Sequence, residues 1–307
     1  MLNARDGTLL VLGGSGFLGA HVVAAAGRRS RRRVAVASRA PRSGPRFGPA
    51  PAATRAVDAG RPGAVPELLD LLVPEAVILC AALARAADCE ADPALARRLN
   101  AELPEEVARW CAGRGARLVH VSTDLVFGGA APAGERYAEA DPPSPLGGYG
   151  ASKAEGEARV LAADPAAAVV RLPLLYGHSG GRGLGASDGL LAALEAGERP
   201  FLFDDEWRTP LPVESAAAAL VELSERPHAG LLHVAGPDRL SRHELGYLVL
   251  AARGLSRPEE RVDAGPRSAR GQAAARARDA SLDTSRARSL LRTPLPGVRE
   301  GLGLEPA

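Results

Sequence analysis

The sequence predicts an α/β protein with a doubly wound parallel sheet, followed by a smaller C-terminal α/β domain. Three observations indicate this fold. Short apolar runs alternate with helical segments from Thr8 to about Leu172, which is the pattern of strand–helix–strand units. Several runs are continuously apolar, such as AVILCAA at 76–82, and suit strands that helices cover on both faces. A glycine cluster, GGSGFLG at 13–19, directly follows the first run.

The alternation assigns elements in order along the first part of the chain. We expect strands at Leu9–Leu12, Val34–Ser38, Ala76–Ala82, Arg117–Ser122 and Ala168–Leu172. We expect helices between them, at Phe17–Ala26, Pro66–Leu72, Pro93–Ala112 and Tyr149–Ala163. A Pro- and Gly-rich loop over 41–53 leads to a further strand before Asp58.

The rhythm changes after Leu172. The segment Gly177–Gly189 is dense in glycine and is expected to be mobile. Helical patterns follow at Leu190–Ala196, Glu214–Glu225 and Arg242–Arg253. The sequence therefore predicts a first domain over 1–172, with a return segment near 209–228, and a second domain mainly over 173–307.

Length and composition exclude several classes of protein. At about 150 residues per domain, 307 residues suffice for two domains with their own cores. A net charge of +2 gives no overall field towards nucleic acid or an anionic membrane. The three cysteines form no C-x-x-C pair, which argues against disulfides and a zinc or other metal site. We see no signal peptide and no run of about 18 apolar residues, so we expect a cytoplasmic protein.

The glycine cluster has the G-x-x-G-x-x-G spacing between a strand and a helix. Glycines there allow a tight turn and a close approach of the backbone to a pyrophosphate, while the helix N-terminus supplies N–H groups and a partial positive charge. An ordinary glycine turn is the alternative. We expect a Rossmann-type dinucleotide site in which the cofactor contacts come from Gly13, Ser15, Gly16, Phe17 and Leu18.

The end of the second strand bears on the choice of cofactor. A carboxylate there would bind a ribose 2′-hydroxyl, whereas an arginine can bind a 2′-phosphate. The chain has Arg39 at this point, which favours NADP (as NADPH), with NAD as the second option. Asp58, after the expected third strand, either lies near adenine or caps a turn.

Lys153 is the only lysine, so 37 of the 38 basic residues are arginine. This bias indicates that arginine stands wherever either side chain serves, and that Lys153 does something arginine cannot. Lys153 lies four residues after Tyr149, which places both side chains on one helix face. An ammonium beside a phenol stabilises the phenolate, so the pair is suited to proton transfer near neutral pH.

The segment HVSTDLVFG at 120–128 ends an apolar strand with hydroxyl groups. Open parallel sheets bind ligands at the carboxyl ends of their strands, where a hydroxyl can donate a hydrogen bond to a substrate carbonyl. Hydroxyls that bind the backbone at a strand end are the alternative.

Together these motifs resemble the extended short-chain dehydrogenase/reductase family. The resemblance rests on GGSGFLG, STDLVFGG, the YGASK pair and RLPLLYG at 171–177. More narrowly, the chain is similar to the dTDP-4-dehydrorhamnose reductase branch, which also contains the regulatory β subunit of methionine adenosyltransferase. Asp92-Pro93, Asn100, YAEADPPSPLGGYG at 137–150 and GLLHVAGPDRLSRHELG at 230–246 support this branch.

The resemblance implies an NADPH-dependent reductase of a 4-keto-deoxysugar nucleotide. Thr123 would polarise the carbonyl, Tyr149 would donate the proton, and Lys153 would hold the cofactor ribose and lower the pKa of the phenol. It also implies cofactor contacts from Ala81, Ala82 and Leu172, and substrate contacts from Asp124, Tyr176, His178 and Arg208. Arg208 would touch the phosphates of the sugar nucleotide; a surface arginine is the alternative.

Two residues depart from the family pattern, Leu125 in place of a tyrosine and Ser215 in place of an aspartate. Related dehydratases carry an acidic base where Leu125 stands, so leucine favours ketone reduction over dehydration. Two other functions stay open. One is a non-catalytic NADP-binding regulatory subunit, and the other is a ketoreductase or epimerase of a secondary metabolite without a nucleotide. The oligomeric state is also open, with a homodimer as one option.

Overall fold

The computed structural model describes residues 7–40, 47–130, 135–272 and 276–305, so part of the predicted loop 41–53 lies outside the described residues. The chain divides into two compact units. Unit 1 comprises Met1–Thr123, Gly148–Arg171 and Ala217–Leu232; unit 2 comprises Asp124–Gly147, Leu172–Ala216 and His233–Ala307. Compared with the predicted first domain, the main difference is the segment 124–147, which belongs to unit 2.

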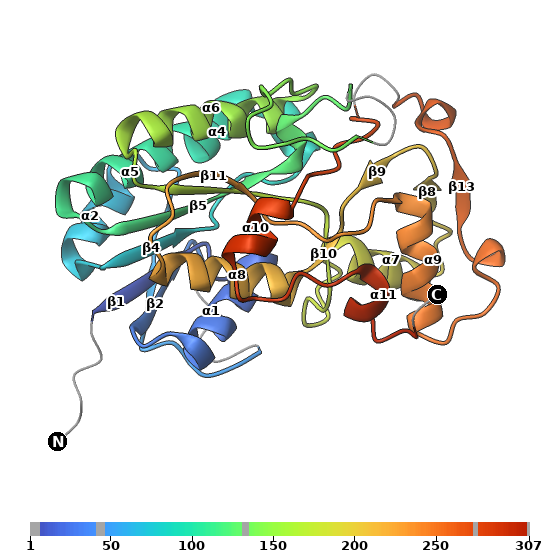
Figure 1. Ribbon diagram of the computed structural model, residues 1–307, viewed down its shortest axis with the longest axis horizontal. Coiled ribbons are helices and arrows are strands. Elements are labelled where there is room, and N and C mark those ends of the chain that lie inside the picture. Colours follow the sequence, from blue (N-terminus) through green and yellow to red (C-terminus); the bar gives the residue numbers. More distant parts are fainter. Residues whose placement is uncertain (1–6, 41–46, 131–134, 273–275, 306–307) are drawn as a thin grey trace. The chain divides into compact units, whose positions relative to one another are not determined.

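Unit 1 is built on a seven-stranded sheet (Figure 1). Its strands are β1 (Thr8–Leu12), β2 (Arg33–Ser38), β3 (Ala53–Ala56), β4 (Ala76–Leu79), β5 (Arg117–Thr123), β6 (Ala168–Leu172) and β11 (Gly230–His233). Their order is β11-β6-β5-β4-β1-β2-β3, and the four pairs from β3 to β5 are parallel. The predicted doubly wound α/β fold is confirmed.

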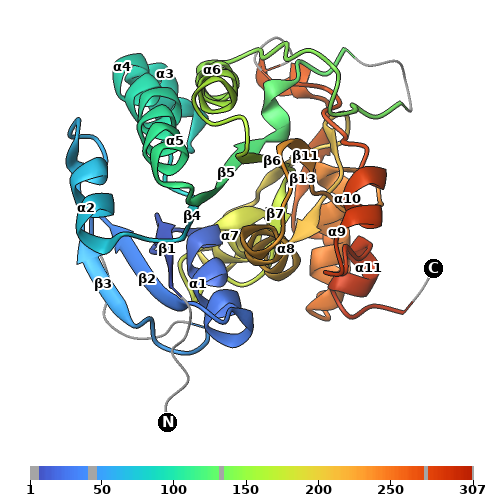
Figure 2. The same ribbon diagram turned by 60° about the vertical axis from the view of Figure 1, so that its left-hand side comes forward.

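The helices of unit 1 cover both faces of this sheet, as Figure 2 shows. They are α1 (Phe17–Arg29), α2 (Ala64–Leu72), α3 (Ala86–Ala91), α4 (Pro93–Arg97), α5 (Leu103–Arg114), α6 (Gly148–Ala163) and most of α8 (Val213–Glu225). The helices α2, α5 and α6 lie on one face, and α1 lies on the other. Buried side chains of β1, β4 and β5 pack against them, with Leu10, Leu79 and Leu118 almost fully buried.

The strand order fixes where a ligand can bind. The chain runs outward from β1 through β2 to β3 and then crosses back to β4 on the other side of β1. Ligands of such sheets bind at the carboxyl ends of the strands, at the point where the order reverses. In this chain that point lies between β1 and β4.

The predicted helix Pro93–Ala112 is wrong in its middle. There α4 leads into a π-helical segment, η1 (Arg98–Glu102), before α5 begins. Pro104 explains the interruption, because it has no N–H to donate to the carbonyl of Asn100 four residues earlier. The predicted strand Ala76–Ala82 also ends early, at Leu79, and the strand β11 was not predicted.

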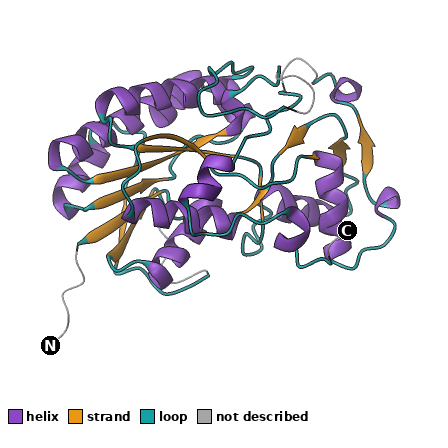
Figure 3. Cartoon of the chain, in the orientation of Figure 1, coloured by secondary structure: helices purple, strands orange, loops and turns teal. Residues whose placement is uncertain are grey.

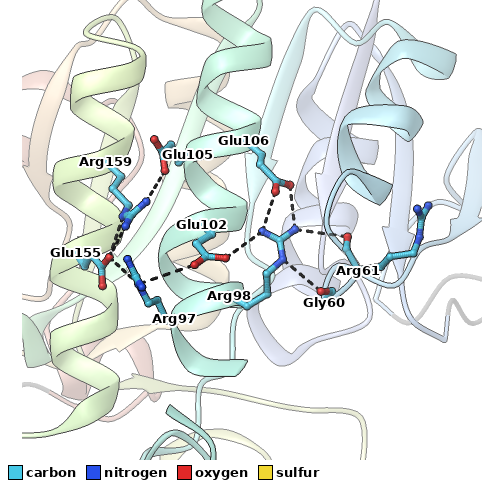
Figure 4. Close-up of polar contacts among 9 residues, drawn as sticks. All are labelled: Gly60, Arg61, Arg97, Arg98, Glu102, Glu105, Glu106, Glu155 and Arg159. Atoms are coloured by element: carbon cyan, nitrogen blue, oxygen red, sulfur yellow. Dashed lines mark hydrogen bonds and ion pairs between the residues drawn. The ribbon is translucent and has the colours of Figure 1, made fainter. Parts of the chain in front are cut away.

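Ion pairs tie this interrupted helix to its neighbours (Figure 4). Arg98 of η1 pairs with Glu106 of α5 at 2.9 Å and donates to the carbonyl of Gly60. Arg97 reaches Glu155 of α6 at 3.1 Å. Arg98 is only 8% exposed, so its pair is largely screened from water, whereas the exposed pairs contribute at most about 1 kcal/mol each.

In its described residues, unit 2 contains three two-stranded sheets. Figure 3 shows its short strands among helices and loops. Unit 2 also has its own hydrophobic core. Its strands are β7 (Leu175–Tyr176), β8 (Phe201–Phe203), β9 (Trp207–Arg208), β10 (Leu211–Pro212), β12 (Leu240–Ser241) and β13 (Asp263–Gly265). Its helices and short turns are η2 (Asp124–Val126), α7 (Gly185–Glu195), α9 (Arg242–Ala252), η3 (Pro258–Glu260), η4 (Arg267–Arg270), α10 (Ser285–Leu290) and α11 (Val298–Gly301). Thus α7 begins inside the glycine-dense segment Gly177–Gly189.

A capping box starts α9. The Ser241 hydroxyl accepts from the backbone N–H of Glu244 at 3.0 Å, and the Glu244 carboxylate accepts from the N–H of Ser241 at 2.6 Å. Buried side chains of α9, including Leu245 and Leu250, pack in the core of unit 2. In the described residues, no helix is long and apolar enough to cross a membrane.

Candidate active site

The glycine turn brings the ends of β1 and β4 into direct backbone contact. Gly13 has a φ of +83°, and a Cβ at this position would lie 2.6 Å from the backbone nitrogen of Ala81. A Cβ on Gly19 would lie 2.2 Å from the carbonyl oxygen of Gly13, so only glycine lets α1 pack on the turn. Gly16 is the N-cap of α1, and no acidic residue stands in the first turn of that helix. This end of α1 is therefore suited to an anion.

The other residues expected to bind the cofactor surround the same strand ends. Ser15, Phe17 and Leu18 are half-buried in the turn and at the start of α1. Ala81 and Ala82 are half-buried directly after β4. All five belong to unit 1, so the structure places them together within one folding unit.

Two residues at the end of β2 bear on which cofactor the protein binds. Arg39 follows the strand and is exposed. The Ser38 hydroxyl is buried and has no hydrogen-bond partner in the described structure, so a ligand hydroxyl or phosphate can satisfy it. Asp58 caps a turn, because its Oδ1 accepts from the backbone N–H of Gly60 at 3.0 Å. The structure therefore shows the turn-capping alternative for Asp58. The glycine turn, the open N-terminus of α1 and the Ser38 hydroxyl together fit a dinucleotide.

Tyr149 and Lys153 lie in the first turns of α6, which packs against β5. Thr123 is the last residue of β5 and is 7% exposed. Tyr149 is half-buried, so its phenol borders both protein and solvent. Unit 1 thus contains all three residues predicted to be catalytic.

Lys153 is a buried ammonium without a carboxylate beside it. The residue is 2% exposed. Its Nζ donates to the carbonyl of Val121 at 2.6 Å and lies 3.3 Å from Nε2 of His120. In the described part of the chain it forms no ion pair within 4.0 Å. Burial lowers the pKa of Lys153 from 10.5 to about 8, although the charge of Glu157 raises it in part.

His120 and Cys80 complete the surroundings of this ammonium. Burial, followed by the charge of Lys153, holds the pKa of His120 well below its usual value, so the imidazole is neutral. Burial raises the pKa of the Cys80 thiol to about 12, so the thiol is neutral as well. Neither group supplies a negative charge to Lys153.

Asn100 connects two segments of the site through hydrogen bonds. The sequence motifs did not predict this role. Its Oδ1 accepts from the N–H of Leu83 at 2.9 Å, and its Nδ2 donates to the carbonyl of Leu83 and to the hydroxyl of Ser152, both at 3.0 Å. The Ser152 hydroxyl donates in turn to the carbonyl of Tyr149 at 3.0 Å. Asn100 therefore links the loop after β4 to the start of α6. A polar residue inside an apolar helical pattern was the available signal.

Two residues predicted to bind substrate form a buried ion pair inside unit 2. Nε of Arg208 lies 3.4 Å from Asp124, and its Nη2 lies 3.4 Å from Glu206. The same guanidinium donates to the carbonyls of Trp207 and Ala277. Arg208 is only 4% exposed. The guanidinium is thus buried among protein groups of unit 2, so the surface-arginine alternative is wrong and a phosphate contact stays a prediction.

The remaining predicted substrate residues differ in exposure. Tyr176 is 1% exposed in the core of unit 2, where burial raises the pKa of its phenol, and its contact with substrate stays a prediction. His178 has an exposed ring whose Nδ1 lies 3.5 Å from Asp188. Leu172, which was expected to contact the cofactor, ends β6 and is buried. Among the described residues, no cluster of ligands suited to a metal is present.

Comparison with known proteins assigns the chain to a family. The model of the RmlD substrate binding domain matches residues 7–304. The chain belongs to the RmlD family. This confirms the predicted relationship to extended short-chain dehydrogenases/reductases of the dTDP-4-dehydrorhamnose reductase type, and with it the predicted class of NAD(P)-dependent oxidoreductases.

Curated relatives include two named reductases and a subunit of another enzyme. The dTDP-4-dehydrorhamnose reductase of Mycobacterium tuberculosis is 36% identical over 244 residues, which is 78% of this chain and 73% of the relative. The probable low-salt glycan biosynthesis reductase Agl14 of Haloferax volcanii is 34% identical, and the match spans 59% of this chain and 61% of that protein. Methionine adenosyltransferase 2 subunit beta of Bos taurus is 31% identical over 75% of this chain and 70% of the relative.

Solved structures show the same fold. A hypothetical dTDP-4-dehydrorhamnose reductase from Sulfolobus tokodaii is 27% identical with a TM-score of 0.78, covering 94% of this chain and 96% of that one. MoeE5 in complex with UDP-glucuronic acid and NAD is 25% identical with a TM-score of 0.78, covering 97% of both chains. The Bacillus anthracis reductase in complex with NADP, at 23% identity and a TM-score of 0.79 over 97% of both chains, supports the fold. The neighbours thus bind either nicotinamide cofactor.

Proposed function

We propose that the RmlD family member is an NADPH-dependent reductase of a 4-keto-deoxysugar nucleotide. The observation that carries the proposal is Lys153, the single lysine of the chain, which is buried four residues after Tyr149 without a carboxylate partner. A structural lysine would be exposed or paired. A buried, unpaired ammonium one helical turn from a phenol is suited to stabilising a phenolate.

Each residue has a defined role in the reduction. Tyr149 donates its phenolic proton to the carbonyl oxygen, and the ammonium of Lys153 stabilises the phenolate that remains. Thr123 donates a hydrogen bond to the same oxygen as negative charge develops there. NADPH, when bound, supplies the hydride that the carbonyl carbon accepts, so the ketone becomes a secondary alcohol. The glycine turn and the N-terminus of α1 hold the pyrophosphate, and Arg39 supports the preference for NADPH.

The substrate class rests on the relatives and on unit 2. The M. tuberculosis relative is named for a dTDP-4-keto sugar, and MoeE5 was solved with a UDP-sugar. Unit 2 carries the residues proposed to touch that substrate, namely Asp124, His178 and Arg208.

The test is an assay of NADPH oxidation with dTDP-4-dehydrorhamnose, and NADH as the comparison. The wild-type protein should oxidise NADPH only when the keto sugar is present. Tyr149→Phe should lower kcat by about a hundredfold to ten-thousandfold, because the proton donor is gone while the ring remains. Tyr247→Phe, on α9 of unit 2, serves as the matched control. Unchanged turnover in Tyr149→Phe would exclude the mechanism.

A second candidate is a non-catalytic NADP-binding regulatory subunit. The match to methionine adenosyltransferase 2 subunit beta favours it. This function requires that the protein bind NADPH, form a stable stoichiometric complex with another protein, and oxidise no NADPH on the keto sugar. The same assay, followed by size-exclusion chromatography of the native protein, separates the two candidates.

A further inference from the structure

The strand β6 carries an arginine in the core of unit 1. Arg171 is 1% exposed in the sequence AVVRL, whose five residues are all buried. Burying a guanidinium is costly unless it is paired. Its partner is Glu157 of α6, which is 3% exposed. The proposed reaction uses neither residue directly.

The carboxylate of Glu157 is fully engaged by this pairing. Nε of Arg171 lies 2.9 Å from Oε1 and 3.2 Å from Oε2, and Nη2 lies 2.7 Å from Oε2. The hydroxyl of Ser122, the residue before Thr123, donates to Oε1 at 2.5 Å. Such a bidentate, charge-assisted pair is stronger and more directional than a pair with an ammonium.

The same carboxylate is also the natural partner of Lys153. Glu157 follows Lys153 by four residues on α6, the spacing at which a lysine and a glutamate form an ion pair on a helix. Lys153 instead donates to the carbonyl of Val121. This cluster thus places two cations, Lys153 and Arg171, within reach of one carboxylate, that of Glu157, which Arg171 binds.

We propose that Arg171 is a positioning residue that withholds the Glu157 carboxylate from Lys153, so that the ammonium remains available to stabilise the Tyr149 phenolate and to hold the cofactor ribose. This role rests on the proposed function. The titratable groups that act on Lys153 in the structure are Glu157 on its own helix, His120 on β5 and Cys80 after β4. Because His120 and Cys80 are neutral, Glu157 alone can neutralise the ammonium.

The single lysine makes the proposal directly measurable. Selective ¹³C labelling of lysine gives one ε-CH₂ resonance, whose pH titration reports Lys153 in the full-length protein without any substrate. In Arg171→Met, Glu157 loses its guanidinium and should pair with Lys153. The midpoint should therefore rise by about one pH unit or more. The kcat for NADPH oxidation should fall about tenfold or more, because the ammonium is drawn from the phenol.

A second substitution tests the cause. In Arg171→Met/Glu157→Gln no anion remains, so the midpoint should return to or below the wild-type value and most of the lost kcat should be recovered. If Arg171→Met does not fold, Arg171→Gln keeps one donor to Glu157 and should shift the midpoint in the same direction. Arg98→Met is the matched control, because it breaks the pair with Glu106 in the same unit. It should lower stability without moving the Lys153 midpoint.

The outcomes separate this inference from the proposed function. A midpoint in folded Arg171→Met or Arg171→Gln equal to that of the wild type, or no reversal in the double variant, would overturn the positioning role. A shifted and reversed midpoint in a protein that oxidises no NADPH on the keto sugar would support the positioning of Lys153 and refute the reductase.

Discussion

At the scale of single residues, the charged side chain of Lys153 inside unit 1 lowers the stability of the fold. Burial of its ammonium lowers its pKa to about 8, and the charge of Glu157, which forms no ion pair with it in the described residues, compensates this only in part. A protein selected for stability alone would place an apolar side chain at this position. The cost is consistent with a role in proton transfer, which requires an ammonium close to a phenol.

The first prediction concerns Lys153→Met. Below pH 8 the lysine is charged in both states, and the shift from 10.5 to about 8 corresponds to about 3 kcal/mol of destabilisation. The hydrogen bond to Val121 offsets about 1 kcal/mol of this. At pH 7 the variant should therefore be about 2 kcal/mol more stable than the wild type, and inactive.

The effect of Lys153 on stability should also change with pH in a defined direction. Between pH 8 and 10.5 the unfolded chain binds more protons at this lysine than the folded protein does, so its contribution to the free energy of unfolding rises with pH. The advantage of Lys153→Met should shrink across that window. Denaturant unfolding at pH 7, 9 and 10.5 measures it. A variant that is less stable than the wild type at pH 7 would contradict this account.

At the scale of elements, the π-helical segment η1 determines how closely α6, which carries Tyr149 and Lys153, packs against it. A Cβ on Gly156 of α6 would lie 2.1 Å from the carbonyl oxygen of Asn100 in η1. Pro104 cannot donate to that carbonyl. Pro104 leaves the Asn100 carbonyl without its helical donor, and Gly156 has no Cβ to collide with that carbonyl. Both features therefore favour the close contact between α6 and η1.

The second prediction follows from this contact. Gly156→Ala should force α6 away from η1 and cost about 1 to 3 kcal/mol. Because Tyr149 and Lys153 lie on α6, a displacement of about 1 Å should lower kcat by up to about a hundredfold. The matched control is Gly113→Ala on α5, where a Cβ meets no atom within 4 Å and should stabilise the helix slightly. Equal effects of the two substitutions on kcat would rule out the packing argument.

Local patterns predicted much of the sheet and the helix that carries Tyr149 and Lys153, because strand alternation and helical spacing are properties of short segments. They did not reveal the partner of Arg171, since Glu157 and Ser122 meet it only after β5, α6 and β6 assemble. They also did not reveal that the ring of Tyr176 is buried, because the place of a residue in a sequence motif does not determine its exposure. The interruption by Pro104 was visible in the sequence but needed the helix register to interpret.

At the scale of the whole molecule, the proposed cofactor site joins segments that are far apart in the sequence. The glycine turn at 13–19, Arg39, the residues after β4 and the start of α6 all belong to unit 1. Unit 2 has a separate core around α7, α9 and β8. A ligand bound at the proposed cofactor site should therefore restrain several distant segments of unit 1 at once.

The third prediction uses this arrangement. NADPH at a hundredfold excess over its Kd should stabilise the protein by about 2.7 kcal/mol, which raises Tm by about 4 °C for a chain of this length. Hydrogen exchange should slow in the glycine turn, in the residues after β4 and in the first turns of α6, because all of them would contact one ligand. The helix α9 of unit 2 serves as the internal reference, and its exchange should not change with NADPH alone. Protection confined to α9, or no rise in Tm, would place the cofactor elsewhere and remove the basis for assigning hydride transfer to the carboxyl ends of β1 and β4.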